Sequence, residues 1–261
     1  MKIFAIGDIV GRRAVAYLGQ NLRRLRTSLG ADFVVANGEN AAEIHGITAT
    51  DADDILAAGV DLITLGNHSF SARGISTYLD DHTGRETGII RPANYPAACP
   101  GVGYTIPAVS GRRILCVNLM GQAFMDPLDN PFALIDRILD RERGGYDLCL
   151  VDFHAEATSE KQAMGYHLAG RASVVFGTHT HVPTADVRIL PGGTGYVTDL
   201  GMTGPTNGIL GTDAAAILQR MRTHMPTRFT VADGPIEGQG VLFTLEDVQP
   251  YRCVRAERIT F

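Results

Sequence analysis

The stretch ASVVFGTHTH at residues 172–181 begins as a buried strand and ends in two histidines. Its short apolar run, Val174 to Phe176, is typical of a strand that is covered on both faces. Gly177, which follows the run, lets the chain turn sharply and lets a ligand approach the backbone. In an extended chain, residues i and i+2 lie on the same side. The rings of His179 and His181 are therefore expected to point in one direction, where each can serve a different metal ion.

Four other apolar strands also end in a polar cluster, and three of these clusters contain a glycine. These clusters are Gly7-Asp8, Asn37-Gly38-Glu39-Asn40, Gly66-Asn67-His68 and Asp152-Phe153-His154. In α/β sheets, binding sites form beyond the carboxyl ends of the strands. We therefore expect five chain segments to bring their oxygen and nitrogen donors to one edge of the fold. The candidate donors are Asp8, Glu39, Asn40, Asn67, His154, His179 and His181.

Helical spacing between these strands predicts an α/β fold. Residues 13–28 show it first, with Gly30 placed to cap the helix, and residues 48–55 open a second helix. Ser159 to Gln162 resembles a capping box that starts a further helix, and 213–224 predicts the last one. Strands are expected towards the C-terminus, including RFTVAD at 228–233. We predict one domain over residues 1–261, with two packed sheets and helices outside them.

The composition limits the class of protein. Hydrophobic residues make up 45% of the 261 residues, which is enough for a substantial core, and no apolar run approaches the roughly 18 residues that span a membrane. The N-terminus is interpreted as a first strand, which predicts a cytoplasmic protein with no membrane partner. The net charge of −5 gives no basic footprint for nucleic acid. The scattered cysteines are predicted to be buried, reduced thiols: Cys99, Cys116, Cys149 and Cys253.

The donor set itself indicates the kind of metal site. It contains carboxylates, amide oxygens and imidazoles but no thiolate, which favours Mn, Fe, Zn or Ni over a structural cysteine–zinc site. Seven donors are too many for one tetrahedral ion, whereas they suit two ions about 3.5–4 Å apart that share a carboxylate and a hydroxide. Two divalent ions, two carboxylates and one hydroxide leave one positive charge. That balance favours an anionic phosphodiester as the substrate.

Other polar residues are given the more ordinary interpretation. His45 follows Glu39 in a loop and is expected to be exposed, although it could touch a substrate. Arg12, Arg91 and Arg188 could hold a phosphate, but ordinary salt bridges explain them better. Asp152 and Glu156 flank His154. A role in orienting an imidazole is as plausible for them as simple solvation.

Taken together, the motifs resemble the calcineurin-like metallophosphoesterases, and in particular the YmdB-like phosphoesterases. Two features depart from the superfamily pattern: Asp8 does not open an Asp-x-His motif, and Gly38-Glu39-Asn40 replaces the usual Gly-Asp. Both departures resemble the pattern of the YmdB-like subgroup. The resemblance covers nearly the whole chain, through GDIVGR, VVANGENAA, DLITLGNH, RPANYP, NLMGQAFMDPLDNPF, VDFHAEATSEKQAMG, GTHTHVPTAD and TDLGMTGP.

This resemblance implies a four-layer αββα sandwich, in which two packed mixed β-sheets are flanked by helices. It also implies 2′,3′-cyclic nucleotide phosphodiesterase activity with two divalent ions, Fe or Mn, with Zn as an alternative. One ion would be held by Asp8, Glu39, Asn40 and His181. The other would be held by Glu39, Asn67, His154 and His179, so that Glu39 is the bridge. His68 would be the proton donor in an in-line attack by metal-activated hydroxide, or else a hydrogen-bonding support for a ligand.

Two other functions stay open at this stage. The same donors suit a two-metal phosphomonoesterase or protein phosphatase, because the sequence indicates the metals better than the leaving group. A regulatory protein acting through an RNA or protein partner is the third hypothesis. The expected substrate is a small phosphodiester, and the sequence leaves open a homo-oligomer.

Overall fold

The computed structural model describes residues 1–43, 45–84 and 86–261. The helices are α1 Arg12–Leu29, α2 Ala49–Ala58, α3 Ile75–Asp81, α4 Pro131–Arg141, α5 Thr158–His167 and α6 Ala214–Thr223. The strands are β1 Lys2–Ile6, β2 Asp8–Ile9, β3 Phe33–Asn37, β4 Leu62–Thr64, β5 Ile89–Ile90, β6 Tyr104–Thr105, β7 Ala108–Val109, β8 Arg112–Met120, β9 Leu148–His154, β10 Val174–Thr178, β11 Arg188–Leu190, β12 Thr194–Val197, β13 Met202–Pro205, β14 Ile236–Glu237, β15 Gln239–Leu245 and β16 Cys253–Thr260.

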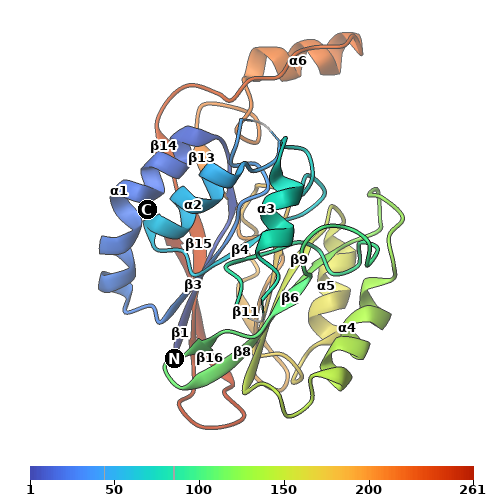
Figure 1. Cartoon of the computed structure of the whole chain (residues 1–261). Coiled ribbons are helices and arrows are strands. Elements are labelled where there is room, and N and C mark those ends of the chain that lie inside the picture. Colours follow the sequence, from blue (N-terminus) through green and yellow to red (C-terminus); the bar gives the residue numbers. More distant parts are fainter. Residues whose placement is uncertain (44, 85) are drawn as a thin grey trace.

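The first large sheet has the strand order β16-β15-β1-β3-β4-β5. Strands β1, β3, β4 and β5 run parallel, and β15 joins β1 antiparallel, so the sheet is mixed. Helices α1, α2 and α3 cover its outer face (Figure 1), where Leu18 and Leu22 of α1 and Ile55 of α2 are fully buried in one apolar cluster.

The second large sheet has the order β11-β12-β10-β9-β8-β6, with β7 also paired to β8. Strands β8, β9, β10 and β12 are parallel, while β6 and β11 are antiparallel at the two edges. Its outer face packs against α4 and α5, through Ile135 and Met164 among others.

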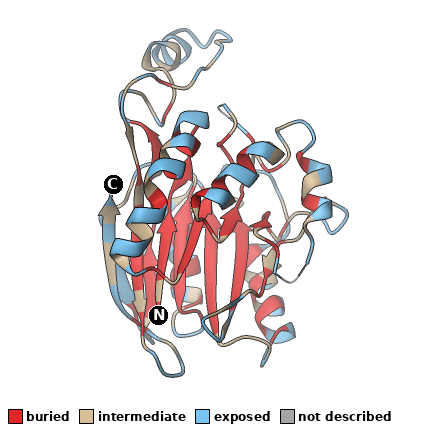
Figure 2. Cartoon of the chain, turned by 60° about the vertical axis from the view of Figure 1, so that its left-hand side comes forward, coloured by how far each residue is buried: buried red, intermediate tan, exposed pale blue. Residues whose placement is uncertain are grey.

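The two sheets pack face to face and bury a third apolar cluster between them. In β1, Ile3 and Ala5 belong to this inner cluster, whereas Phe4 and Ile6 belong to the cluster under α1. This alternation follows from the two-residue period of a strand. Figure 2 shows buried strands behind helices whose outer faces are exposed. The order of layers is helix, sheet, sheet, helix, which confirms the predicted αββα sandwich.

Most predicted elements are present, with three differences. Helix α5 begins at Thr158 after Ala157, and no side chain caps it, so the predicted capping box at Ser159 is wrong. Ser159 lies inside the first turn of the helix, and the next residue, Glu160, accepts hydrogen bonds from the N–H groups of Gln122 and Ala123. Residues 228–233 form no strand and contribute one isolated bridge, from Val231 to Thr212.

A third small sheet, β14-β13-β2, was not predicted from the sequence. Its strands are two to four residues long, which gives too little periodicity to recognise. The sheet matters for the site because β2 begins at Asp8 and pairs with β13.

All four cysteines are free thiols, as predicted; Cys116, Cys149 and Cys253 are buried, whereas the predicted burial of Cys99 is wrong, because its side chain is half-buried. Among the described residues, no helix has both the length and the apolar character that crossing a membrane requires.

Helix α6 stands away from the body of the molecule at the top of Figure 1. It lies in the long connection between β13 and β14, and none of its residues is buried. The chain on either side of it, at Leu210 and Val231, returns to the edge of the fold where the candidate donors lie.

Candidate metal centre

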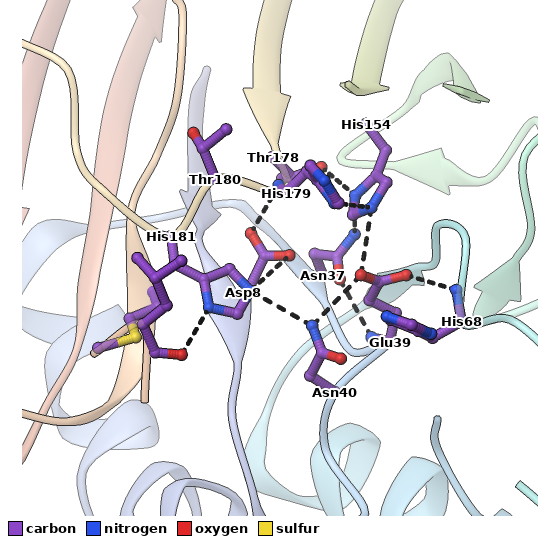
Figure 3. A network of polar contacts seen from close by, with 12 residues as sticks. Asp8, Asn37, Glu39, Asn40, His68, His154, Thr178, His179, Thr180 and His181 are labelled. Atoms are coloured by element: carbon purple, nitrogen blue, oxygen red, sulfur yellow. Dashed lines mark hydrogen bonds and ion pairs between the residues drawn. The ribbon is translucent and has the colours of Figure 1, made fainter. Parts of the chain in front are cut away.

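The strand ends of both large sheets meet at one edge, where all seven predicted donors contact at least one other member of the set. Figure 3 labels six of the seven, all except Asn67. Asp8 follows β1, Glu39 and Asn40 follow β3, and Asn67 and His68 follow β4. From the second sheet, His154 ends β9, and His179 and His181 follow β10. Asp8, Glu39, Asn40 and His154 are buried, and His179 and His181 are half-buried.

The glycines beside the donors are required by close packing. A β-carbon at Gly66 would overlap the His154 ring and the Glu39 carboxylate. A β-carbon at Gly7 would overlap the backbone carbonyl of Gly201, and one at Gly177 the carbonyl of Thr198. A side chain at Gly66 would therefore fill the space where the donors converge, which explains why glycine precedes the ligand there.

One group of donors surrounds the Nε2 atom of His154. Three atoms that can accept a hydrogen bond lie within 3.1 Å of it: Asn67 Oδ1 at 2.9 Å, Glu39 Oε1 at 3.1 Å and His179 Nδ1 at 3.1 Å. Glu39, His154 and His179 are also the carboxylate and imidazole residues whose ligand atoms lie within 4.8 Å of one another. A ring nitrogen carries at most one hydrogen, so a single N–H cannot serve all three acceptors well.

The other ring nitrogen of His154 is held by a buried chain of hydroxyl groups. Thr178 donates its hydroxyl hydrogen to Asp152 at 2.8 Å. Its oxygen can then only accept a hydrogen bond, so the 2.9 Å contact with His154 Nδ1 places a hydrogen on Nδ1. A second contact, from Asn37 Nδ2 to His154 Nδ1, is longer at 3.4 Å, and we give it less weight. With hydrogen on Nδ1, the neutral ring presents the lone pair of Nε2 to the cluster, as a metal ligand does.

The His179 ring is oriented like that of His154, with one nitrogen held by a hydrogen-bond acceptor and the other facing the cluster. Its Nε2 lies 3.0 Å from the Glu156 carboxylate, while its Nδ1 faces His154. Burial, together with the neighbouring His154, lowers the pKa of His179 to about 3, so the ring is neutral and its one N–H goes to Glu156. Nδ1 is then another lone pair that is aimed at the cluster.

The lowered pKa of Glu39 indicates that the space among these donors favours a positive charge. Burial alone would raise its pKa, but the attraction of His154 and the contacts with His68 outweigh burial and lower the pKa to about 2. Burial would likewise lower the pKa of His154, yet the Glu39 carboxylate raises it. A cation among these acceptors satisfies all of them at once, which a proton on one nitrogen does not. The residues fit a metal ion.

A second group of donors lies around Asp8. His181 Nδ1 lies 3.1 Å from the Leu210 carbonyl, which can only accept, so the hydrogen is on Nδ1 and the lone pair of Nε2 points inward. That Nε2 lies 3.3 Å from Asn40 Nδ2 and 3.7 Å from Asp8 Oδ1. Burial raises the pKa of Asp8 to about 6.

Two oxygens of this second group have no hydrogen-bond partner in the described part of the chain. They are Asp8 Oδ1 and Asn40 Oδ1, and both are buried. Such atoms are rare in folded proteins, because a buried acceptor without a partner costs about 1–3 kcal/mol. Oxygens of a carboxylate and an amide are ligands for divalent ions, so this group also fits a metal.

The two groups share Glu39. Its Oε1 contacts His154 and also accepts from Asn40 Nδ2 at 3.2 Å, and its Oε2 accepts from the N–H of His68 at 2.9 Å. The contacts therefore divide into Asp8, Asn40 and His181 on one side and Asn67, His154 and His179 on the other, with the carboxylate between them. This division is the same as the ligand assignment that the resemblance to the YmdB-like family implied. That these residues bind two ions stays a prediction.

His68 lies beside the cluster and is oriented by it. Its Nε2 lies 3.1 Å from Asn67 Nδ2, and its ring stacks on His45 with centroids 3.9 Å apart. Burial lowers the pKa of His68. His45 also lines the pocket, together with His68, His179 and His181, so its exposed loop position does not separate it from the site.

A buried ion pair supports the loop that carries His179 and His181. Lys161 Nζ lies 2.7 Å from Asp199 Oδ2, and both side chains are 0% exposed. The same carboxylate oxygen accepts from the N–H and hydroxyl groups of Thr180 at 3.1 and 2.7 Å. His179 and His181 have φ values of 99° and 60°, which are costly for residues other than glycine, so the loop needs such support.

Some of these supporting residues could not be found from the sequence. Lys161 is on a predicted helix and Asp199 follows a predicted strand, and no spacing rule connects them. Asn37, whose Oδ1 accepts from the N–H of Glu39, was visible only as part of a polar cluster. Arg91 was assigned an ordinary salt bridge, but it donates to backbone carbonyls, including those of Pro92 and Pro100. Arg188 lies over the rings of Tyr166 and Tyr196.

The comparison with known proteins agrees with this fold and site. The sequence pattern of the YmdB-like protein family matches residues 4–259. The 2′,3′-cyclic-nucleotide 2′-phosphodiesterase of Bacillus subtilis (strain 168) is 43% identical over 259 residues, which cover 99% of this chain and 96% of that protein.

Two solved structures have the same fold. A hypothetical protein from Thermus thermophilus superposes with a TM-score of 0.91 at 39% identity, covering 100% of this chain and 99% of the other. A novel phosphatase from Mycoplasma pneumoniae superposes with a TM-score of 0.92 at 30% identity, covering 100% and 93%.

A four-layer αββα fold with carboxylate, amide and imidazole donors at its strand ends defines the class as a metallophosphoesterase. Within that class, the match over almost the whole length shows the family: this chain belongs to the YmdB-like proteins.

Proposed function

We propose that this protein is a two-metal phosphodiesterase that hydrolyses 2′,3′-cyclic nucleotides. The observation that carries the proposal is the crowding of acceptors around His154 Nε2 beside two buried oxygens without partners, in a chain 43% identical to a cyclic-nucleotide phosphodiesterase. Asp8, Asn40 and His181 would hold one divalent ion, Asn67, His154 and His179 the other, and Glu39 both. Fe or Mn is the predicted metal, with Zn as the alternative.

When bound, the ions would polarise the phosphate oxygens and activate the attacking water. The chain's own residues would do the rest. The strained loop at His179 and His181, held by Asp199, would keep the ligand atoms in place before substrate arrives. Preorganised groups of this kind need no rearrangement at the moment of reaction.

His68 is the proposed proton donor. Attack of water at phosphorus breaks the bond to the ribose O2′, and the departing oxygen must take up a proton to become the hydroxyl of the nucleoside 3′-phosphate product. The His68 ring lines the pocket, and none of the described carboxylates lies within hydrogen-bonding distance of its ring nitrogens, which supports its role in giving a proton to the substrate. Burial lowers its pKa, and an anionic phosphate beside the ring would counteract that shift by favouring the imidazolium form.

A substrate panel tests this function. Purified protein would be freed of metal with a chelator, reloaded with Mn²⁺, Fe²⁺ or Zn²⁺, and assayed on 2′,3′-cyclic nucleotides, 3′,5′-cyclic nucleotides, phosphomonoesters and phosphopeptides. We expect metal-dependent hydrolysis of the 2′,3′-cyclic nucleotides with the highest kcat/KM. Full activity in chelator would contradict the metal site, and a preference for monoesters or phosphopeptides would favour a phosphomonoesterase or protein phosphatase instead.

A further inference from the structure

The pocket over the candidate metal centre is too small for a whole nucleotide. Its volume is about 120 Å³, and residues such as Glu39, Asn40 and His181 line it. Sites that bury small organic ligands usually have about 300–1,000 Å³. The pocket therefore has room for the reacting phosphate, and the rest of the substrate must lie outside it.

A larger cleft of about 430 Å³ opens next to this pocket. Val231 lines both of them, and Ala42 and Glu43 of the cleft wall come shortly after Glu39 and Asn40 in the chain. The backbone at Gly11 connects the two walls: its N–H donates to the Asn40 carbonyl, and its α-carbon faces Val231 and the Glu43 carbonyl. A substrate that leaves the metal pocket past Val231 enters this cleft.

The cleft is lined by three arginines, although the chain as a whole has a net charge of −5. Arg12 and Arg13 come from the start of α1, and Arg228 comes from the segment that returns from α6. Helix α6 and this segment together, residues 214–232, contain three arginines and no Asp or Glu, and they are flanked by Asp213 and Asp233. Among the described residues that line the cleft, the one carboxylate belongs to Glu43, which is exposed.

The three arginines differ in the hydrogen bonds and ion pairs that their guanidinium groups make with the rest of the protein. Arg13 donates to the Gly234 carbonyl at 2.5 Å and lies 3.7 Å from the exposed carboxylate of Asp233. Arg12 lies 3.6 Å from Asp51, but 67% of its side chain is exposed. For Arg228, the described residues provide no carboxylate or carbonyl within hydrogen-bonding or ion-pairing distance. Its guanidinium is available to a ligand, and this group pairs with phosphate through two parallel N–H bonds.

We propose that this cleft binds a second phosphate, the one attached to the 5′ oxygen of the reacting nucleotide. The preferred substrate is then an oligoribonucleotide that ends in a 2′,3′-cyclic phosphate, and a free cyclic mononucleotide is a poorer one. The inference rests on the proposed phosphodiesterase function and adds the substrate class. It needs only one internucleotide phosphate beside Arg228 and Arg12, so it is consistent with the acidic net charge of the chain.

The reaction is unchanged by the longer substrate. Water adds to the terminal phosphorus, the bond to O2′ breaks, and O2′ takes up the proton, while the internucleotide phosphate remains intact in the cleft. A class of reaction that leaves 2′,3′-cyclic phosphates on RNA ends, namely cleavage by attack of a 2′-hydroxyl on the adjacent phosphodiester, would supply such substrates.

The test compares three substrates on the metal-loaded protein: adenosine 2′,3′-cyclic phosphate, the same nucleotide with a 5′-phosphate, and the dinucleotide ApA with a terminal 2′,3′-cyclic phosphate. The key variant is Arg228→Gln, and Arg228→Lys retains the charge. Arg24→Gln is the matched control, because Arg24 is an exposed arginine of α1 outside the cleft. Metal content and thermal unfolding would be measured for each variant.

We expect Arg228→Gln to lower kcat/KM about tenfold for both substrates that carry the additional phosphate, the loss typical of one charge-assisted hydrogen bond. The loss should lie in KM, since the contact does not change along the reaction. The plain cyclic mononucleotide should change less than about twofold, Arg228→Lys should recover part of the loss, and Arg24→Gln should behave as wild type.

Other outcomes separate the two proposals. If wild type hydrolyses the cyclic mononucleotide but Arg228→Gln affects all three substrates equally, or none, the cleft inference is wrong and the phosphodiesterase function stands. If only the dinucleotide depends on Arg228, the contact is to the second nucleoside and the phosphate assignment is wrong. If wild type hydrolyses none of the three, the proposed function fails, and the inference fails with it.

Discussion

The two halves of the candidate metal centre are built differently. Around His154, every donor atom has neighbours: Nδ1 is held by Thr178 and Asp152, and Nε2 faces Glu39, Asn67 and His179. Around Asp8, two buried oxygens have no partner in the described chain, and the supporting contact of His181 comes from the Leu210 carbonyl near the protruding α6 segment.

The difference indicates where the protein is preorganised. In the His154 half, the His154 ring is fully buried next to Asp152, and burial raises the pKa of Asp152 to about 7 even though Thr64 and Thr178 donate to it. The Asp8 half depends on the short strand β2 and on a loop, and Asp8 Oδ1 and Asn40 Oδ1 have no hydrogen-bond partner among the described residues. We expect the His154 half to bind its ion more tightly.

The largest effect is expected at Glu39, because its carboxylate joins the two halves. Glu39→Gln keeps the size of the side chain but removes its charge. Occupancy should fall at both ions, and hydrolysis of 2′,3′-cyclic nucleotides should fall roughly 10³-fold or more, since bound metals contribute several kcal/mol to catalysis. Elemental analysis with activity assays measures both. Two ions bound normally in Glu39→Gln would show that it is not the bridge.

The next effect concerns His68, which lies on the His154 side without being one of the donors. His68→Ala should slow hydrolysis of 2′,3′-cyclic nucleotides by roughly 10²–10⁴-fold, because the ribose alkoxide is a poor leaving group that needs a proton. Hydrolysis of bis-p-nitrophenyl phosphate should be slowed much less, since p-nitrophenolate leaves unaided, and both ions should stay bound.

The kcat of each substrate in His68→Ala, measured with metal content, decides its role. Equal losses on both substrates, or the loss of an ion, would mean that His68 positions phosphate or supports a ligand. His45→Ala is a useful companion variant, because it removes the ring that stacks on His68 and leaves the donor set intact.

Single-ion variants test the comparison directly. Asn67→Ala should remove one of two ions, from the His154 half, and Asn40→Ala should remove one from the Asp8 half. Titration of metal into each apo variant gives the affinity of the remaining site. We expect the site left in Asn40→Ala to be the tighter of the two. If either variant loses both ions, the halves are not separable and the division of ligands is wrong.

The smallest effect is expected from the loop support. Thr180→Val removes the hydroxyl that donates to Asp199 but keeps the backbone N–H bond and the side-chain shape. Metal affinity should fall about tenfold, the lower end for residues that orient a ligand. Thr27→Val is the control, because Thr27 is exposed on α1 and its hydroxyl donates only to the Arg23 carbonyl. Unchanged affinity in Thr180→Val would show that the ion pair below the loop is sufficient.

Much of this molecule could be predicted from its sequence, because the decisive patterns are local. The apolar runs at β1, β3, β9 and β10 indicate buried strands, and the polar clusters after them indicate one edge of the fold. The confirmed cap at Gly30 and the αββα layers follow from such patterns. The failed capping box at Ser159 shows the limit, because the helix begins one residue earlier, at Thr158, and Ser159 lies inside its first turn and not at the N-cap.

The sequence by itself determined which residues are candidate donors and that they lie at strand ends, since period and residue type are properties of neighbouring positions. Tertiary structure alone decided which donors meet, which ring nitrogen carries the hydrogen and which arginine lines the cleft. The reason is physical: Lys161 and Asp199, or Arg228 and Arg12, are brought together by the packing of separate layers, and no local spacing encodes that distance.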